Sequence, residues 1–172
     1  CAIIKDKEMK LIGKGTFTKA YLKDKHTVIL HSVDPIKECM SLGMFPNSRL
    51  FPKIERLTYE EVSTYKMKLL KKVRAPKRQL KPAHYTLYKE LKKLAGSISF
   101  KLRDNVSKLN VPTSVKAHLV VAVEACMNYT DQVAFEISPR NIAESNGNLI
   151  LMDCFYDANL LRKQKQRFLE GK

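Results

Sequence analysis

Hydrophobic and polar positions alternate along the front of the chain, and this pattern predicts short strands. The alternation covers residues 9–12 and 17–23, while residues 27–31 are rich in β-branched side chains. A Gly-Lys-Gly turn at 13–15 and an Asp-Lys turn at 24–25 separate these runs. Period-two alternation bounded by turn residues is typical of half-buried strands. The sequence therefore predicts a three-stranded meander with a glycine turn after its first strand.

A short helix is expected next. Asp34 is suited to be its N-cap, Pro35 suits the first helical position, and Gly43 is expected to end it. Runs at 53–57 and 64–70 then return to a strand-like pattern. The segment 75–82 is basic and contains two prolines, so it is predicted to be a linker between two lobes.

The second half of the chain has mostly helical periodicity. Helices are predicted over 84–95, 99–109 and from 113 to about 127, because apolar residues recur there every three or four positions. Residues 133–141 look like a loop, and 142–152 look like a hairpin with an Asn-Gly turn. A basic helix is expected over 156–169. These elements predict an α+β fold with a β lobe over 1–74 and a mostly helical lobe over 75–172.

The charge of the chain is strongly positive. It carries 32 Lys and Arg against 17 Asp and Glu, a formal charge of +15, and many of the cations lie within 66–82 and 162–167. Such a field attracts polyanions, so these stretches suit an acidic protein partner or nucleic acid. A solvated surface that keeps the protein in solution is the alternative interpretation.

Composition and cysteine spacing indicate a globular cytoplasmic protein. The longest apolar runs are far too short to span a membrane, and charges at 5–8 argue against a secretory signal. The four cysteines, Cys1, Cys39, Cys126 and Cys154, form no CxxC pair. We interpret them as reduced packing residues rather than zinc ligands.

The first chemical motif is the glycine turn between the first two predicted strands. Glycines let backbone N–H groups approach a phosphate without a Cβ in the way. The residues expected to form this phosphate-binding loop are Gly13, Lys14, Gly15, Thr16, Phe17, Thr18, Lys19 and Ala20. A plain hairpin turn is the alternative for this segment.

The second motif combines a loop with the hairpin that follows it. Glu136 is followed five residues later by Asn141, and Asp153 comes at the end of the apolar run 149–152. Carboxylate and amide oxygens are the ligands that Mg²⁺ prefers, so Asn141 and Asp153 are candidate metal ligands. Glu136 would be left to accept a hydroxyl proton. Two unrelated surface carboxylates are the alternative interpretation.

The order of these elements and motifs resembles the protein-kinase superfamily. The kinase catalytic loop reads H-R-D-x-x-x-x-N and is followed by a hairpin and an Asp. Glu136, Asn141 and Asp153 stand at those three positions, and Arg140 matches the Arg of the D-L-A-A-R-N form. The whole is most similar to the miniature serine/threonine kinases that bacterial viruses use to modify host proteins. The resemblance implies a minimal two-lobed kinase-like fold with a truncated second lobe.

The resemblance also implies site roles, with clear departures. Arg140 would reach the γ-phosphate of ATP, with Mg²⁺ on Asn141 and Asp153. The lysine expected on the third strand is missing, because Leu30 or His31 stands there. Lys14, Lys19 or His31 could take over its contact with the phosphates, and the neighbouring helix offers Glu38 as the remnant of an ion-pair partner.

Two functions follow from these observations. The first is Mg–ATP-dependent transfer of phosphate to protein Ser, Thr or Tyr hydroxyls, in the cytoplasm of a host cell. The second is a non-catalytic kinase-like scaffold whose basic surface binds an acidic protein or nucleic acid.

Overall fold

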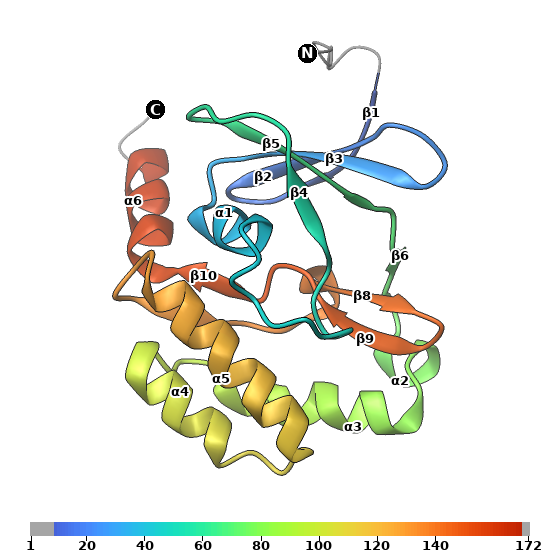
Figure 1. Ribbon diagram of the computed structural model, residues 1–172, viewed down its shortest axis with the longest axis vertical. Helices are drawn as coiled ribbons and strands as arrows, with labels where there is room; N and C mark the ends of the chain where they lie inside the picture. Colours follow the sequence, from blue (N-terminus) through green and yellow to red (C-terminus); the bar gives the residue numbers. More distant parts are fainter. Residues whose placement is uncertain (1–8, 170–172) are drawn as a thin grey trace.

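The computed structural model describes residues 9–169 of the chain. Its first lobe is a five-stranded antiparallel sheet in the order β1-β2-β3-β5-β4, with helix α1 packed beneath it (Figure 1). The strands are β1 (Lys10–Lys14), β2 (Thr18–Leu22), β3 (Thr27–Ser32), β4 (Ile54–Arg56) and β5 (Ser63–Lys68), and α1 spans Pro35–Ser41. Cys1 and the charged segment 5–8, used in the sequence arguments above, lie outside the described residues.

The local signals for this lobe are confirmed. The Asp34 carboxylate accepts a hydrogen bond of 2.9 Å from the Ile36 amide, and Pro35 opens α1. After the helix, Gly43 takes a φ of 75°, a conformation that suits glycine. The Asp34 N-cap fixes the start of α1 at Pro35, shortly after β3 ends at Ser32.

The second lobe is mostly helical and carries two small sheets. Its helices are α2 (Pro76–Gln79), α3 (Pro82–Leu91), a 3-10 turn (Lys92–Leu94), α4 (Ser99–Ser107), α5 (Thr113–Met127), a second 3-10 turn (Pro139–Asn141) and α6 (Ala158–Leu169). Strands β6 (Lys71–Lys72), β8 (Ile142–Ser145) and β9 (Asn148–Leu151) form one sheet, and β7 (Val133–Phe135) pairs with β10 (Phe155–Asp157).

The predicted helices and the hairpin are confirmed, with φ values of 53° at Asn146 and 81° at Gly147 in its turn. Two predictions were wrong in part. The expected loop 133–141 contains β7, and the expected linker 75–82 contains α2 and the start of α3. β7 and α2 span only three and four residues, too short to show a period. β7 forms because it pairs with β10, a partner twenty residues away.

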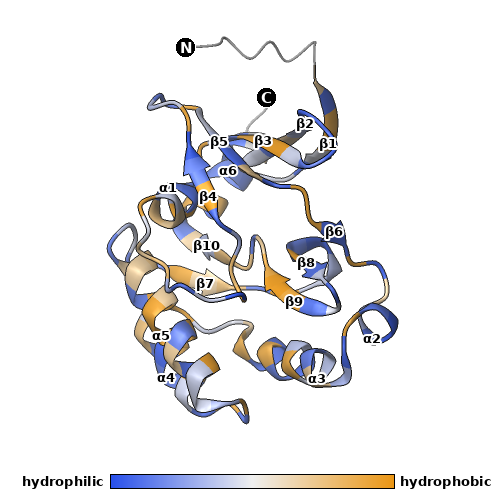
Figure 2. Cartoon of the chain, turned by 45° about the vertical axis from the view of Figure 1, so that its right-hand side comes forward, coloured by the Kyte–Doolittle hydropathy of each residue, from blue (hydrophilic) through white to orange (hydrophobic). Residues whose placement is uncertain are grey.

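One continuous hydrophobic core joins the two lobes. Phe51, Phe135 and Phe155 lie in contact within it, and Phe135 packs edge-on to Phe155 at 5.1 Å between ring centroids. Figure 2 shows hydrophobic residues concentrated on β7, β9 and the helices next to them, whereas α2 and β6 are hydrophilic. Cys39, Cys126 and Cys154 are free and buried, as their interpretation as packing residues predicts.

The architecture confirms the expected fold class. An antiparallel β lobe with one short helix precedes a mostly helical second lobe, as in a minimal kinase-like fold. A boundary at residue 74 stays a prediction. Within 9–169, none of the helices combines the length and hydrophobicity that crossing a bilayer requires.

Candidate functional site

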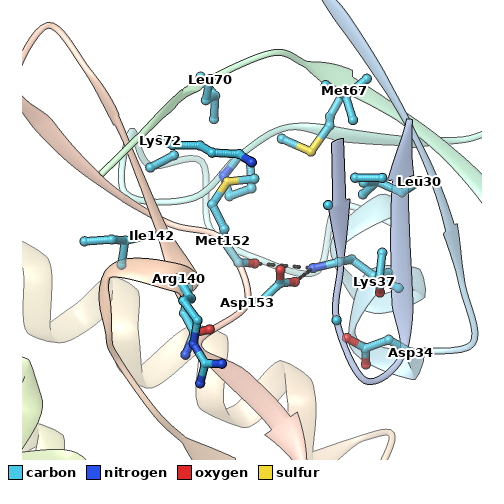
Figure 3. A pocket seen from close by; sticks show the side chains of 18 of the residues that line it. Leu30, Asp34, Lys37, Met67, Leu70, Lys72, Arg140, Ile142, Met152 and Asp153 are labelled. Carbon is cyan, nitrogen blue, oxygen red and sulfur yellow. Dashed lines mark hydrogen bonds and ion pairs between the residues drawn. The ribbon is translucent and has the colours of Figure 1, made fainter. Parts of the chain in front are cut away.

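A cavity of about 780 Å³ lies between the β lobe and the second lobe. Residues from the β1–β2 turn, β3, α1, the connection after β5 and the ends of β8 and β9 line it. Figure 3 shows that its two ends differ: Leu30, Met67 and Leu70 form a mostly apolar end with Lys72 beside them, and Lys37, Asp153 and Arg140 form a charged end. A cavity with this size and division suits a ligand with a flat apolar part and an anionic part.

The glycine turn closes one side of the cavity. The lining includes the residues Gly13, Lys14, Gly15, Thr16, Phe17, Thr18 and Ala20. The Thr18 hydroxyl lies 2.6 Å from the Ser32 hydroxyl, which in turn donates to the Phe17 carbonyl at 3.2 Å. These contacts tie the tip of the turn to the end of β3, and so fix its position over the cavity.

The glycines of this turn are not required by the packing. A Cβ at Gly13 would lie 3.7 Å from the Ala20 Cβ, and one at Gly15 would lie 3.8 Å from the Thr18 carbonyl oxygen, both ordinary contacts. The Gly15 amide donates to the Thr18 carbonyl at 2.8 Å, so it closes the turn. Because the Gly15 amide is already used within the turn, a bound anion would accept hydrogen bonds from the other amides at its tip.

Two predicted site residues lie elsewhere. Lys19 and His31 are paired across β2 and β3, and neither lines the cavity. His31 instead contacts Tyr21, with ring centroids 4.8 Å apart. Successive strand residues point to opposite faces, so Leu30 occupies the cavity face where the kinase resemblance expects a lysine. The structure thus separates these two residues from the other candidates.

The second motif converges on the opposite wall of the cavity. Glu136, Arg140, Asn141 and Asp153 all line it. The Asn141 carbonyl accepts hydrogen bonds from the amides of Met152 (2.9 Å) and Asp153 (3.1 Å), which joins the loop to the end of β9. The Asn141 side-chain Nδ2 donates to the Glu136 carbonyl at 3.3 Å, which leaves Oδ1 as the side-chain atom that could ligate a cation.

Lys37 on α1 is a site residue that the sequence argument missed. Its ammonium forms an ion pair with the Asp153 carboxylate and donates to the Met152 carbonyl at 3.3 Å (Figure 3). The Lys37 side chain is 4% exposed and that of Asp153 is 52% exposed. A fixed cation thus lies at the charged end of the cavity, although β3 provides none.

The electrostatics of this end are set by three groups. Burial lowers the pKa of Lys37, but the carboxylates of Asp153 and Asp34 outweigh it, so the net pKa is raised above its ordinary value. Burial raises the pKa of Asp34 to about 6, although Lys37 opposes this shift. Lys37 therefore stays charged at neutral pH, held between two carboxyl groups.

Glu38, the expected ion-pair partner of the missing lysine, points elsewhere. Its carboxylate binds the Arg56 guanidinium at 2.9 Å, on the side of α1 that faces β4. The signal that could have identified Lys37 is its position on the helix. It lies among Ile36, Cys39 and Met40, the other buried residues of α1. A lysine among buried positions of a short helix needs a charged partner.

The charged end offers oxygen atoms to a cation, but not a complete metal site. Within residues 9–169, no group of three or more His, Cys, Asp or Glu side chains could hold a metal ion. Mg²⁺ in phosphate sites takes one or two protein ligands and completes its shell from phosphates and water. The Asp153 carboxylate and the Asn141 amide oxygen fit that pattern, so the donor set suits a metal that arrives with a phosphorylated ligand.

The chain shows only slight similarity to known proteins. No protein-family model matches the chain, and no curated protein matches it. One similar solved structure is a ternary complex of APH(2")-IIa with streptomycin and ATP. It is 14% identical, with a TM-score of 0.39, and the match covers 87% of this chain and 67% of the other.

Proposed function

We propose that the protein transfers the γ-phosphate of ATP to a hydroxyl group of a protein, as a small Mg²⁺-dependent kinase. The observation that carries the proposal is the convergence of the glycine turn, Lys37, Asn141, Asp153 and Glu136 on one cavity. Positioning and electrostatic stabilisation supply most of the catalysis in phosphoryl transfer. A cavity with an apolar end and a fixed cation at the other end supports both.

Each end of the cavity has a role in this proposal. Leu30, Met67 and Leu70 would hold the adenine ring, and Lys37 and Arg140 would bind the phosphates. Lys37 takes the role of the lysine missing from β3, because it presents a charged amine to the same cavity. Arg140 stabilises the charge on the transferred group. Bound Mg²⁺, held by Asn141 and Asp153, supplies neutralisation of phosphate charge.

Glu136 acts as the base in the proposed reaction. Its carboxylate accepts the proton of the acceptor hydroxyl, whose oxygen forms a bond to the γ-phosphorus. The bond between the γ-phosphorus and the bridging oxygen breaks, and that oxygen leaves with ADP. The products are a phosphorylated protein side chain, ADP and a protonated Glu136.

The test is transfer of label from γ-labelled ATP. Purified protein with Mg²⁺ is incubated with a bacterial lysate as the acceptor mixture, since the resemblance to kinases of bacterial viruses makes host proteins the proposed substrates. We expect labelled protein bands with the wild type and a loss of roughly 10²-fold or more with Glu136→Gln. Equal labelling by the wild type and the variant, or no labelling by either, refutes the proposal.

A second candidate is a kinase-like scaffold that binds without catalysis. The observation that favours it is Leu30 at the position of the third-strand lysine, together with an Asp153 carboxylate already paired to Lys37. In this function the basic stretches 66–82 and 162–167 bind an acidic protein or nucleic acid. Strong weakening of that association by salt, with no label transfer, would support this candidate over the first.

A further inference from the structure

A second hollow adjoins the proposed catalytic loop on the outside of the second lobe. It has a volume of about 670 Å³, and its lining includes Lys77, Arg78, Tyr85, Tyr88, Lys92 and Pro139. We call it the α2–α3 groove. Pro139 lines both this groove and the central cavity. A chain lying in the groove would therefore reach the cavity beside Arg140.

The walls of the α2–α3 groove combine cations with aromatic rings. Tyr85 and Tyr88 stack at 6.3 Å with an interplanar angle of 19°. Lys89 lies 4.7 Å from the centre of the Tyr85 ring, and Lys92 lies 4.9 Å from that of Tyr88. The tyrosines thus hold two lysine stems in place along α3.

No ion pair among the described residues neutralises the cations of the groove. Lys77, Arg78 and Lys92 are exposed, and none of them takes part in an ion pair within 9–169. The whole stretch 66–82 contains no Asp or Glu. Glu90, two residues before Lys92, binds Lys93 and the Asn110 amide instead. This surface is therefore complementary to a negatively charged partner.

We propose that the α2–α3 groove binds an acidic segment of the protein substrate and directs a neighbouring hydroxyl into the central cavity. An acidic peptide fits better than a nucleic acid strand, because Tyr85 and Tyr88 already face each other and the lysines. Bases stack on exposed aromatic faces, and these rings are committed. The role as a substrate site rests on the proposed kinase function, whereas the binding of acidic peptide does not.

The test is a binding titration that is monitored by fluorescence anisotropy. The probe is a labelled peptide with one Ser followed by four Glu, and the control peptide carries Gln in place of Glu. The double variant Lys77→Glu/Arg78→Glu changes the groove. Lys23→Glu/Lys25→Glu in the turn between β2 and β3 makes the same change in net charge outside the groove. Thermal melts of both variants confirm that they are folded.

We expect the groove variant to bind the acidic peptide roughly 10-fold more weakly, and the variant in the β2–β3 turn to stay within about twofold of the wild type. Equal weakening by both variants would overturn the proposal, since it indicates net charge alone. Tighter binding of a short single-stranded oligonucleotide that depends on the same two cations would also overturn it. If the peptide binds as expected but no label is transferred, the groove stands and the kinase function fails.

Discussion

Replacement of Lys37 by Met tests the cation that the structure places in the cavity. Methionine keeps much of the volume of the lysine stem but removes its ammonium, which is buried and paired with Asp153. Breaking a buried ion pair costs about 3–5 kcal/mol when the remaining charge stays buried. Here the remaining carboxylate is 52% exposed and can be hydrated. We therefore expect a loss of only about 1–2 kcal/mol in the free energy of unfolding.

The effect of this substitution on nucleotide binding should be larger than its effect on stability. A hydrogen bond to a charged group contributes about 1.5–3 kcal/mol, which corresponds to roughly a 10- to 150-fold loss of ATP affinity. Calorimetric titration with Mg–ATP measures it, and chemical denaturation measures stability. Lys19→Met is the matched control, since Lys19 does not line the cavity.

Lys14→Met separates the two candidate lysines, because Lys14 also lines the cavity but is exposed. If Lys14→Met lowers ATP affinity and Lys37→Met does not, the role assigned to Lys37 is wrong. An unchanged affinity in both variants would show that neither amine contacts the phosphates.

Three further predictions concern other features of the structure. Asp34→Asn should flatten the pH dependence of stability. The pKa of Asp34 is about 6 in the folded state and 3.8 in the unfolded chain, so protonated Asp34 favours the folded state. The wild type should therefore lose about 1–3 kcal/mol of its free energy of unfolding as the pH rises from 4 to 7. Denaturation of both proteins at several pH values checks this, and equal slopes would refute it. Gly147→Ala should lower the free energy of unfolding by about 1–2 kcal/mol, because φ at this position is +81° and the new Cβ would lie 3.0 Å from the Lys81 side chain. An unchanged melting temperature would contradict this prediction. Asn141→Ala should abolish the effect of Mg²⁺ on ATP affinity. It should barely change the melting temperature, because the main-chain carbonyl of Asn141, which the substitution keeps, makes the bonds that join the loop to β9. A large fall in the melting temperature would show a structural role for the side chain instead.

The sequence predicted the elements whose signals are local. The meander, the capped helix at Asp34 and the hairpin at Asn146–Gly147 depend on neighbouring residues, and the structure contains all three. The short strands β7 and β10 escaped prediction because each is three residues long and exists only through pairing with the other. Such elements depend on contacts between distant parts of the chain.

The candidate site shows the same division. Glu136, Asn141 and Asp153 were candidates because of their spacing along the chain, and all three line the cavity. Lys37 belongs to no motif with a characteristic spacing. Its position among apolar residues of α1 indicates only that it is buried, whereas its pairing with Asp153 depends on how α1 packs against the end of β9. The choice between Leu30 and His31 likewise needed the register of β3, which turns Leu30 into the cavity.

The proposed function makes Asp153 and Lys37 parts of one Mg–nucleotide site. Its most direct test is an ATP titration of the wild type and Asp153→Asn, each with Mg²⁺ and with a chelator. We predict that Mg²⁺ tightens ATP binding to the wild type at least tenfold (about 1.4 kcal/mol) and has no effect on the variant. An equal gain from Mg²⁺ in both proteins, or no ATP binding by the wild type, would contradict the claim.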